Sequence, residues 1–346
     1  MRVFYVIIFL SFGFVAIAQN KVADSLINKL NTTTVDSQKV KLFGDISWEL
    51  LSSDINRSLA YAIKELELAT SINSTKDIAQ AESDIGNIYN RKADYPNALM
   101  HYYKALAVRQ KLKQPIKVAG IYTNIATVMM RQNKFKEALD INFKTLKIFE
   151  DVNDVNKQSL VLSNIGNLYY NLNQNKQALY YFTKALGLAK QTNNKSSQAN
   201  INVNIADIKY DEKNYTTAEY YFNNALKIYR EIEDKYSMAA VYNNLGNILT
   251  NKNDFTGAIK YFNLSLQQRI LLEDDFGIAQ THATIGELNK KQKKYKEALQ
   301  HFNMSLEIFK KTNSTLQLEK IYKLLAETYQ LAGDLNSSVK NYKLYI

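Results

Sequence analysis

The residues of this chain whose type and spacing could do chemistry are polar residues, seven of them asparagines, that recur at two fixed positions of an internal repeat. They fall in two columns that stand three positions apart, and residues three apart share one face of a helix. An asparagine amide both donates and accepts hydrogen bonds, which matches the backbone of an extended peptide. The same amides could instead bond neighbouring repeats to one another. The first column is Asp84, Asn124, Asn164, Asn204, Asn244 and Thr284, and the second is Asn87, Thr127, Asn167, Asp207, Asn247, Glu287 and Glu327.

Two arginines extend this polar face. Arg91 and Arg131 lie one helical turn beyond the second column, where they could meet a ligand carboxylate or face solvent at a helix end. Asparagine is a poor residue for the middle of a helix, so its recurrence there indicates a role in binding or in bonding. The candidate peptide-binding residues are Asn87, Arg91, Asn124, Arg131, Asn164, Asn167, Asn204, Asp207, Asn244 and Asn247.

No constellation of catalytic or metal-binding residues can be recognised in the sequence. The three histidines are His101, His282 and His301, and none has the spacing of metal ligands. There is no nucleophile elbow, phosphate loop or Ser/His/Asp set. We therefore expect no enzymatic activity in this chain, and neither a cofactor nor a metal ion.

The elements that position the polar columns follow from the 40-residue period itself. It runs without insertion or deletion from the mid-40s to the last residue, which is typical of a solenoid of two-element units. A column of small residues precedes a mostly aromatic column, which predicts pairs of closely packed helices. The small column is Ile46, Gly86, Ala126, Gly166, Ala206, Gly246, Gly286 and Ala326, and the aromatic column is Ala62, Tyr102, Asn142, Phe182, Phe222, Phe262, Phe302 and Tyr342.

Residues 79–118 illustrate one unit. Apolar and small residues over 79–92 form one stripe and predict a helix. Asp94 can cap a second helix, with Pro96 in its first turn, where a missing N–H does no harm. The segment 113–117, which includes Pro115, is expected to end that helix.

These columns resemble the tetratricopeptide repeat. Ile85-Gly86-x-x-Tyr89, followed by Ala98, Tyr102 and Ala105, matches its pattern closely, and so does the segment that starts at Ile165. The family's usual period is about 34 residues, whereas the 40-residue unit and Asn244-Leu245-Gly246-Asn247 resemble the LGN-type scaffold proteins. The resemblance implies an all-α, right-handed α-solenoid of about eight helix-turn-helix repeats. It also implies that the first helices line a concave groove, where asparagines grip a peptide backbone.

The expected organisation has three parts. Residues 1–18 are a signal peptide, residues 19–36 an N-terminal segment with a short capping helix over 22–30, and residues 37–346 eight repeats, the last incomplete. The first repeat departs from the pattern at Ile46 and Ala62, as suits a terminal repeat. In the third repeat Asn142 replaces the aromatic residue, with Phe143 beside it, which puts the local packing in doubt.

Export is expected from the N-terminal residues. Arg2 precedes the apolar run 3–15, and Ala16-Ile17-Ala18 offers a small-x-small cleavage site before Gln19. An uncleaved membrane anchor is the alternative, although the run is short for a span. The chain has no cysteine, so it can form no disulfide, and the fold depends on packing alone.

The formal charge of +11 at pH 7 comes from lysines scattered along the repeats. Together with the export signal this disfavours nucleic acid, so the expected partner is a protein or peptide. The layout resembles that of Bacteroidetes extracytoplasmic sensor proteins, which would place a membrane tether and an output module beyond Ile346. A free-standing periplasmic scaffold and a binder of an acidic polymer are the alternatives.

Overall fold

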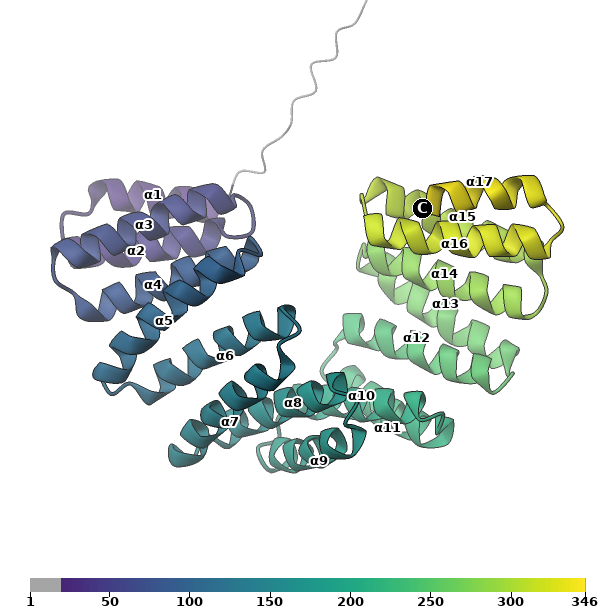
Figure 1. The fold of residues 1–346 in the computed structure, drawn as a ribbon, viewed down its shortest axis with the longest axis horizontal. Coiled ribbons are helices and arrows are strands. Elements are labelled where there is room, and N and C mark those ends of the chain that lie inside the picture. Colours follow the sequence, from purple (N-terminus) through teal and green to yellow (C-terminus); the bar gives the residue numbers. More distant parts are fainter. Residues whose placement is uncertain (1–19, 346) are drawn as a thin grey trace, which may run out of the picture. The chain divides into compact units, whose positions relative to one another are not determined.

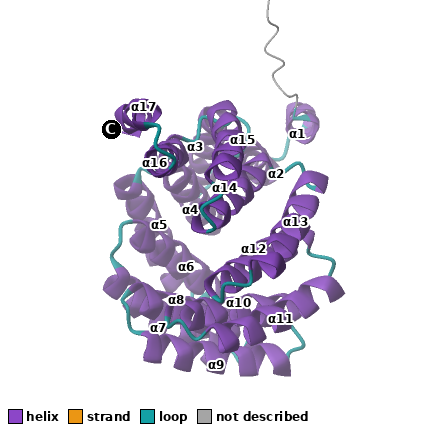
Figure 2. Cartoon of the chain, turned by 90° about the vertical axis from the view of Figure 1, so that its right-hand side faces the viewer, coloured by secondary structure: helices purple, strands orange, loops and turns teal. Residues whose placement is uncertain are grey.

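The computed structural model describes residues 20–345, which fold into 17 α-helices joined by short loops (Figure 1). No strand occurs within that range (Figure 2). The predicted signal peptide lies outside the described residues. The helices are α1 Lys21–Thr32, α2 Asp36–Leu50, α3 Ile55–Ser71, α4 Thr75–Arg91, α5 Tyr95–Lys111, α6 Pro115–Arg131, α7 Phe135–Asp151, α8 Val155–Asn171, α9 Asn175–Gln191, α10 Lys195–Asp211, α11 Tyr215–Glu231, α12 Lys235–Asn251, α13 Phe255–Leu271, α14 Asp275–Lys291, α15 Tyr295–Lys311, α16 Thr315–Leu331 and α17 Leu335–Tyr345.

The chain divides into two compact units, which meet in the sequence between Ile148 and Phe149. Within each unit consecutive helices pack side by side (Figure 1). The most extensive contacts join the two helices of one repeat, as in α4 with α5, α8 with α9 and α10 with α11. The predicted all-α architecture of helical hairpins is confirmed in both units. None of the helices formed by residues 20–345 is long and apolar enough to cross a membrane.

The 40-residue period has a local origin. The helices from α3 to α16 all have the same length of 17 residues. Each is followed by a three-residue loop, so one helix and its loop occupy half a repeat. Each of these loops holds one residue with positive φ, a region that asparagine tolerates better than most residues. Many asparagines outside the two columns serve this purpose, and the positions are Asn73, Ala93, Lys113, Asn133, Asn153, Asn173, Asn193, Lys213, Glu233, Asn253, Glu273, Lys293, Asn313 and Gly333.

The predicted start of the second helix is confirmed. Asp94 caps α5 by accepting a hydrogen bond from the Asn97 N–H at 3.3 Å, and Pro96 lies in the first turn. The second helix ends at Lys111, just before the segment expected to end it, and Pro115 in that segment begins α6. A proline fits the first position of a helix, where its missing N–H would have had no partner.

The contact between a glycine of the small column and a ring of the aromatic column holds four of the hairpins together. Tyr102, Phe182 and Phe302 are fully buried. Each ring lies against the glycine of the preceding helix, so closely that a Cβ on Gly86 or Gly166 would stand 2.7 Å from ring carbon atoms. Helices can approach this closely only where one of them carries no larger side chain.

Asn142 shows how the fold accommodates a departure from the pattern. It is 2% exposed, and its Nδ2 donates to the Ala138 carbonyl of the same helix at 2.8 Å. The polar amide is therefore satisfied within α7, and Phe143 lies at the partly exposed edge. The small residue opposite, Ala126, takes the place of the usual glycine.

The N-terminal helix covers the first repeat. In α1, Ala23 is 1% exposed, and it packs with Leu26, Ile27 and Leu30 against Ile46 and Leu50 of α2. The sequence predicted a helix over 22–30 in this role, and the structure extends it by one residue at the start and two at the end.

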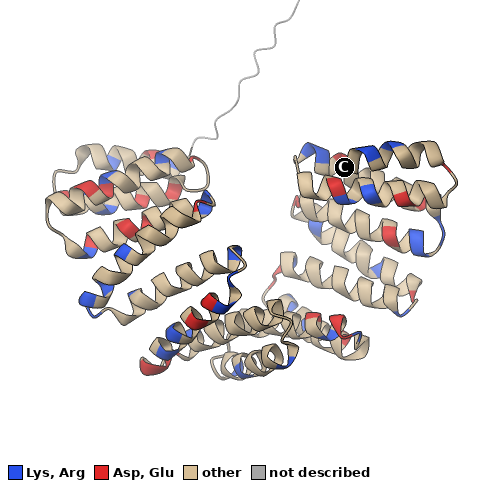
Figure 3. Cartoon of the chain, in the orientation of Figure 1, with Lys and Arg blue, Asp and Glu red and all other residues tan. Residues whose placement is uncertain are grey.

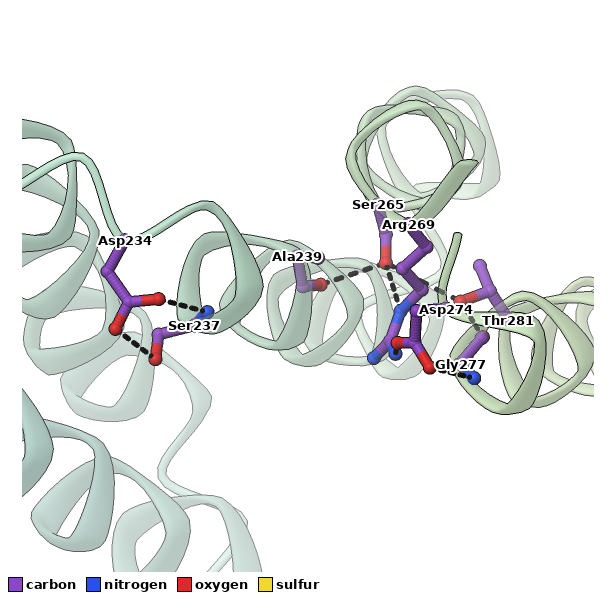
Figure 4. Close-up of polar contacts among 8 residues, drawn as sticks. All are labelled: Asp234, Ser237, Ala239, Ser265, Arg269, Asp274, Gly277 and Thr281. Atoms are coloured by element: carbon purple, nitrogen blue, oxygen red, sulfur yellow. Dashed lines mark hydrogen bonds and ion pairs between the residues drawn. The ribbon is translucent and has the colours of Figure 1, made fainter. Parts of the chain in front are cut away.

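A buried ion pair joins α13 to the start of α14 (Figure 4). Arg269 is 7% exposed, and its Nη1 donates to Asp274 Oδ2 at 2.6 Å. Asp274 also caps α14 by accepting from the Gly277 N–H at 2.9 Å. Ser265 lies between Arg269 and the Ala239 carbonyl (Figure 4). Gly277 leaves the space that the arginine fills, because a Cβ there would overlap Nη1 of Arg269.

Exchange of Gly166 for alanine should lower the free energy of unfolding by about 1–2 kcal/mol, because the added methyl group collides with the Phe182 ring. Gly187→Ala is the matched control, since a Cβ at that helical position meets nothing within 4 Å. It should raise the stability by up to about 1 kcal/mol through helix propensity. Urea denaturation followed by circular dichroism measures both, and equal effects of the two variants would contradict the packing model.

Exchange of Asp274 for alanine should destabilise the protein by about 3–5 kcal/mol, because it leaves Arg269 buried without its partner. Asp254→Ala is the control, because Asp254 caps α13 through the Gly257 N–H at 2.9 Å without a buried arginine. Its loss should cost only about 1 kcal/mol. Thermal unfolding of the two variants tests the difference, and similar melting temperatures would speak against a structural role for the ion pair.

Candidate functional site

In the first unit the polar columns bond neighbouring repeats. Asn87 of α4 and Asn124 of α6 are half-buried, and Asn124 Nδ2 donates to Asn87 Oδ1 at 3.0 Å. The Tyr102 hydroxyl donates to the same oxygen at 2.8 Å. This oxygen therefore already accepts two hydrogen bonds from the protein.

A second set of contacts joins consecutive first helices one turn further on. Arg131 Nη1 donates to the carbonyl and the side-chain oxygen of Asn90, at 3.2 and 3.1 Å. Arg91 is exposed and has no partner among the described residues. In the second unit the same spacing along the chain recurs in the pairs Tyr170–Asp211, Tyr210–Asn251 and Thr250–Lys291.

In the second unit the asparagines of the two columns lie on α8, α10 and α12, and their side chains are not bonded within the protein. Asn164, Asn204 and Asn244 form the first column there, with Asn167 and Asn247 in the second. All five are half-buried, yet their side-chain amides make no hydrogen bond to any described residue. Five amides thus retain their capacity to donate and accept.

One atom contributes to the difference between the two units. Tyr102 supplies the hydroxyl that bonds Asn87, whereas Phe182 and Phe262 stand at the same repeat position in the second unit. The buried rings pack alike, but phenylalanine has nothing to donate. Asn167 and Asn247 therefore lack the partner that Asn87 has.

Three of the predicted residues meet around one small pocket. Asp207, Asn244 and Asn247 line it together with Tyr210 and Phe222. Burial, reinforced by the charge of Asp211, raises the pKa of Asp207 to about 6. Near neutral pH a fraction of this carboxyl group is therefore protonated, so that it can donate a hydrogen bond as well as accept one.

The structure adds residues that the sequence reasoning missed. Tyr170 and Tyr210 stand three positions after the second column, so they continue its face. The same spacing could have revealed them, but aromatic residues in a repeat are usually taken as core. A larger pocket lies further along the second unit among α12, α14 and α16, and Thr284, Glu287 and Glu327 of the columns line it.

The histidines bond to side chains of adjacent helices. His101 Nδ1 lies 2.5 Å from Glu82 Oε2, and the Nδ1 atoms of His282 and His301 lie 3.1 Å apart. Burial lowers the pKa of both His282 and His301, so the pair favours the neutral forms. Within residues 20–345 no group of three or more histidine or acidic side chains is placed to hold a metal ion.

The fold and the polar first helices define a helical-repeat protein, and comparison with family models agrees. The tetratricopeptide repeat model matches residues 197–270 and 237–311. The model of the soluble NSF attachment protein family matches residues 53–227. The chain belongs to the tetratricopeptide repeat family.

Several solved structures share this fold. The apo quorum sensor NprR from B. thuringiensis is 13% identical, with a TM-score of 0.68 over 94% of this chain and 91% of that chain. Aspartyl phosphate phosphatase F from Bacillus subtilis is 15% identical, with a TM-score of 0.67 over 99% and 95%. The Rap conjugation gene regulator of plasmid pLS20, solved with the Phr* peptide, is 15% identical, with a TM-score of 0.60 over 94% and 93%. No curated protein gave a significant match.

Proposed function

We propose that this chain is an exported repeat scaffold that binds an extended protein or peptide segment along α8, α10 and α12. The observation that carries the proposal is the set of five half-buried asparagine amides in the second unit, none of which bonds to a described residue. Because these amides are accessible and unpaired within the protein, they are suited to receive the donors and acceptors of a bound backbone.

The chemistry of the face favours a peptide backbone. The three first-column asparagines recur once per repeat on consecutive first helices, which the Tyr170–Asp211 and Tyr210–Asn251 contacts hold together. Each amide can form one donor and one acceptor bond with a peptide unit. The pLS20 regulator, whose fold this chain shares, was solved with a bound peptide, which supports the same use of the fold here.

The charge distribution favours a peptide over an acidic polymer. Lysine and arginine are interspersed with aspartate and glutamate along the helices of both units (Figure 3). Several lysines are paired, such as Lys252 with Glu219 and Lys195 with Glu231. An anionic polymer would require an extended surface of one sign.

The triple exchange of Asn164, Asn204 and Asn244 for alanine tests the proposal. Peptides selected by the wild-type protein from a displayed library of random 12-residue sequences serve as probes. Loss of three hydrogen bonds, each contributing about 0.5–1.5 kcal/mol, should weaken their binding by at least about tenfold. Fluorescence anisotropy measures the affinity, and circular dichroism should show unchanged helicity.

The matched control is the triple exchange of Asn223, Asn263 and Asn303 for alanine. These asparagines are exposed at one repeat position on α11, α13 and α15 of the same unit. The control should bind the selected peptides as the wild type does. Equal affinity of both triple variants, or a library from which no sequence is enriched, would refute the proposal.

The export and sensing roles rest on the N-terminal sequence and on the layout of the chain. When the full chain is expressed in a bacterium with an outer membrane, we expect the mature protein in the periplasm, with Gln19 as its first residue. Ala18→Leu should block this cleavage, because the site needs a small residue at that position. N-terminal sequencing of the purified protein decides the matter, and a chain that still begins at Met1 would contradict the prediction.

A further inference from the structure

A second candidate site lies in the first unit, in a pocket of about 680 Å³ among α2, α3 and α4. We propose that this pocket binds an organic cation, an alkylammonium or guanidinium group, between the Glu65 carboxylate and the Trp48 ring. The inference does not depend on the proposed peptide site, because the two sites share no residue.

Glu65 is an exception within the repeat. Its side chain belongs to α3 and is 3% exposed, and Oε2 has no hydrogen-bond partner. The same position in the next six repeats carries small residues, which are Ala105, Thr145, Ala185, Ala225, Ser265 and Ser305. Burial of a carboxyl group without a hydrogen-bond donor destabilises the folded protein. Its presence at a position that otherwise carries a small residue therefore indicates that a ligand supplies the donor.

The first helix is adapted to this carboxyl group. Gly44 occupies the position that carries Asp84, Asn124 or Asn164 in later repeats. A Cβ on Gly44 would lie 3.0 Å from Glu65 Oε2, so the glycine leaves room for the carboxyl group. Both Gly44 and Glu65 line the pocket. On α3 the large Glu65 thus replaces the small residue of later repeats, and on α2 the small Gly44 replaces their aspartate or asparagine.

The surroundings of Glu65 are acidic on two helices. Asp45 of α2 and Asp77 and Asp84 of α4 line the same pocket, and Lys41 is the one basic side chain among its lining residues. Lys41 makes no ion pair with a described residue. The pocket therefore presents four carboxyl groups and one amine.

Two of the other carboxyl groups near Glu65, those of Asp77 and Asp84, have donors of their own, and Asp45 is exposed to solvent. Ser74 donates to Asp77 at 2.5 Å, and Gln80 Nε2 donates to both oxygens of Asp84 at 3.2 and 3.1 Å. Gln80 accepts in turn from Arg109 at 3.2 Å. Glu65 has no such donor, so it is the group that an incoming cation would satisfy.

Trp48 gives an independent indication of the ligand. It is the only tryptophan of the chain, it lines the pocket, and it is 64% exposed. An open indole ring beside carboxylates is a favourable environment for an alkylammonium or guanidinium group, because the ring face attracts cations. No three acidic side chains of residues 20–345 are placed to share a metal ion, which favours a cation that carries its own N–H donors.

Binding should be coupled to the release of a proton. Burial, reinforced by Asp84, Asp77 and Asp45, raises the pKa of Glu65 to about 9. The empty pocket therefore holds this carboxyl group mostly protonated at neutral pH, and a bound cation stabilises the charged form. Burial also raises the pKa of Asp84 to about 6, so this second carboxyl group titrates mainly below pH 7. The affinity should consequently rise with pH below about 9, and the rise between pH 7 and 8 should vanish when Glu65 is replaced by glutamine.

The test uses the full chain and the fluorescence of Trp48. Two probes, spermidine and the capped tripeptide acetyl-Gly-Lys-Gly-amide, are titrated at low salt at pH 6, 7 and 8. We expect the Trp48 fluorescence to change and then saturate with at least one probe. If spermidine binds more tightly, the ligand is a free amine, and if the tripeptide binds more tightly, it is a side chain of a peptide. The tripeptide with an acetylated lysine, which has no charge, should produce no change.

Glu65→Gln should weaken binding by at least about tenfold, since the charged hydrogen bond is lost. Glu67→Gln, on the exposed side of the same helix, should bind as the wild type does. The triple asparagine variant of the second unit should also bind the cation normally, which keeps this test separate from that of the peptide site. Circular dichroism checks that the variants fold, and an absent signal with both probes, or equal binding by Glu65→Gln, would overturn the proposal.

Discussion

The close contact between a glycine or alanine of one helix and a buried ring of the next is the constraint on which the structure depends. The rings of Tyr102, Phe182 and Phe302 fill the space that the missing side chains of Gly86, Gly166 and Gly286 leave. Because each contact lies within one hairpin, the fold needs no central core and can extend by repetition. The chain has no cysteine, so these contacts and a few buried polar bonds hold the repeats together without covalent support.

Repetition of the core leaves the remaining positions free to differ. Where the ring carries a hydroxyl, as in Tyr102, the facing asparagine is bonded within the protein. Where the ring is phenylalanine, the facing asparagine amide has no hydrogen-bond partner within the protein and is available to a binding partner. The first repeat shows a third outcome. There the first helix carries the small Gly44 and the second helix the large Glu65, whereas later repeats have the larger residue on the first helix. Similar backbones thus present three chemically different surfaces.

The period and the residue columns predicted the fold almost completely, because packing in a repeat is a local property that recurs in the sequence. Asp94 as a cap and Pro96 in the first turn follow directly from backbone hydrogen bonding. The candidate site was predictable only as a pair of columns. Whether Asn87 or Asn247 is bonded depends on an atom of a different helix, and the sequence alone does not reveal which neighbours meet. Glu65 breaks a column of small residues that the period makes visible, but only the structure shows that its carboxyl group is buried without a donor.

The even spacing of helices and loops has a consequence for the gene. From α3 to α16 a helix with its loop takes half a repeat, so the positive-φ positions stay in phase from Asn73 to Asn313. A recombination event between two repeats of the coding sequence would then join a helix to a helix and a loop to a loop. An array of this kind can therefore lengthen or shorten by whole hairpins while each remaining repeat keeps its contacts with its neighbours.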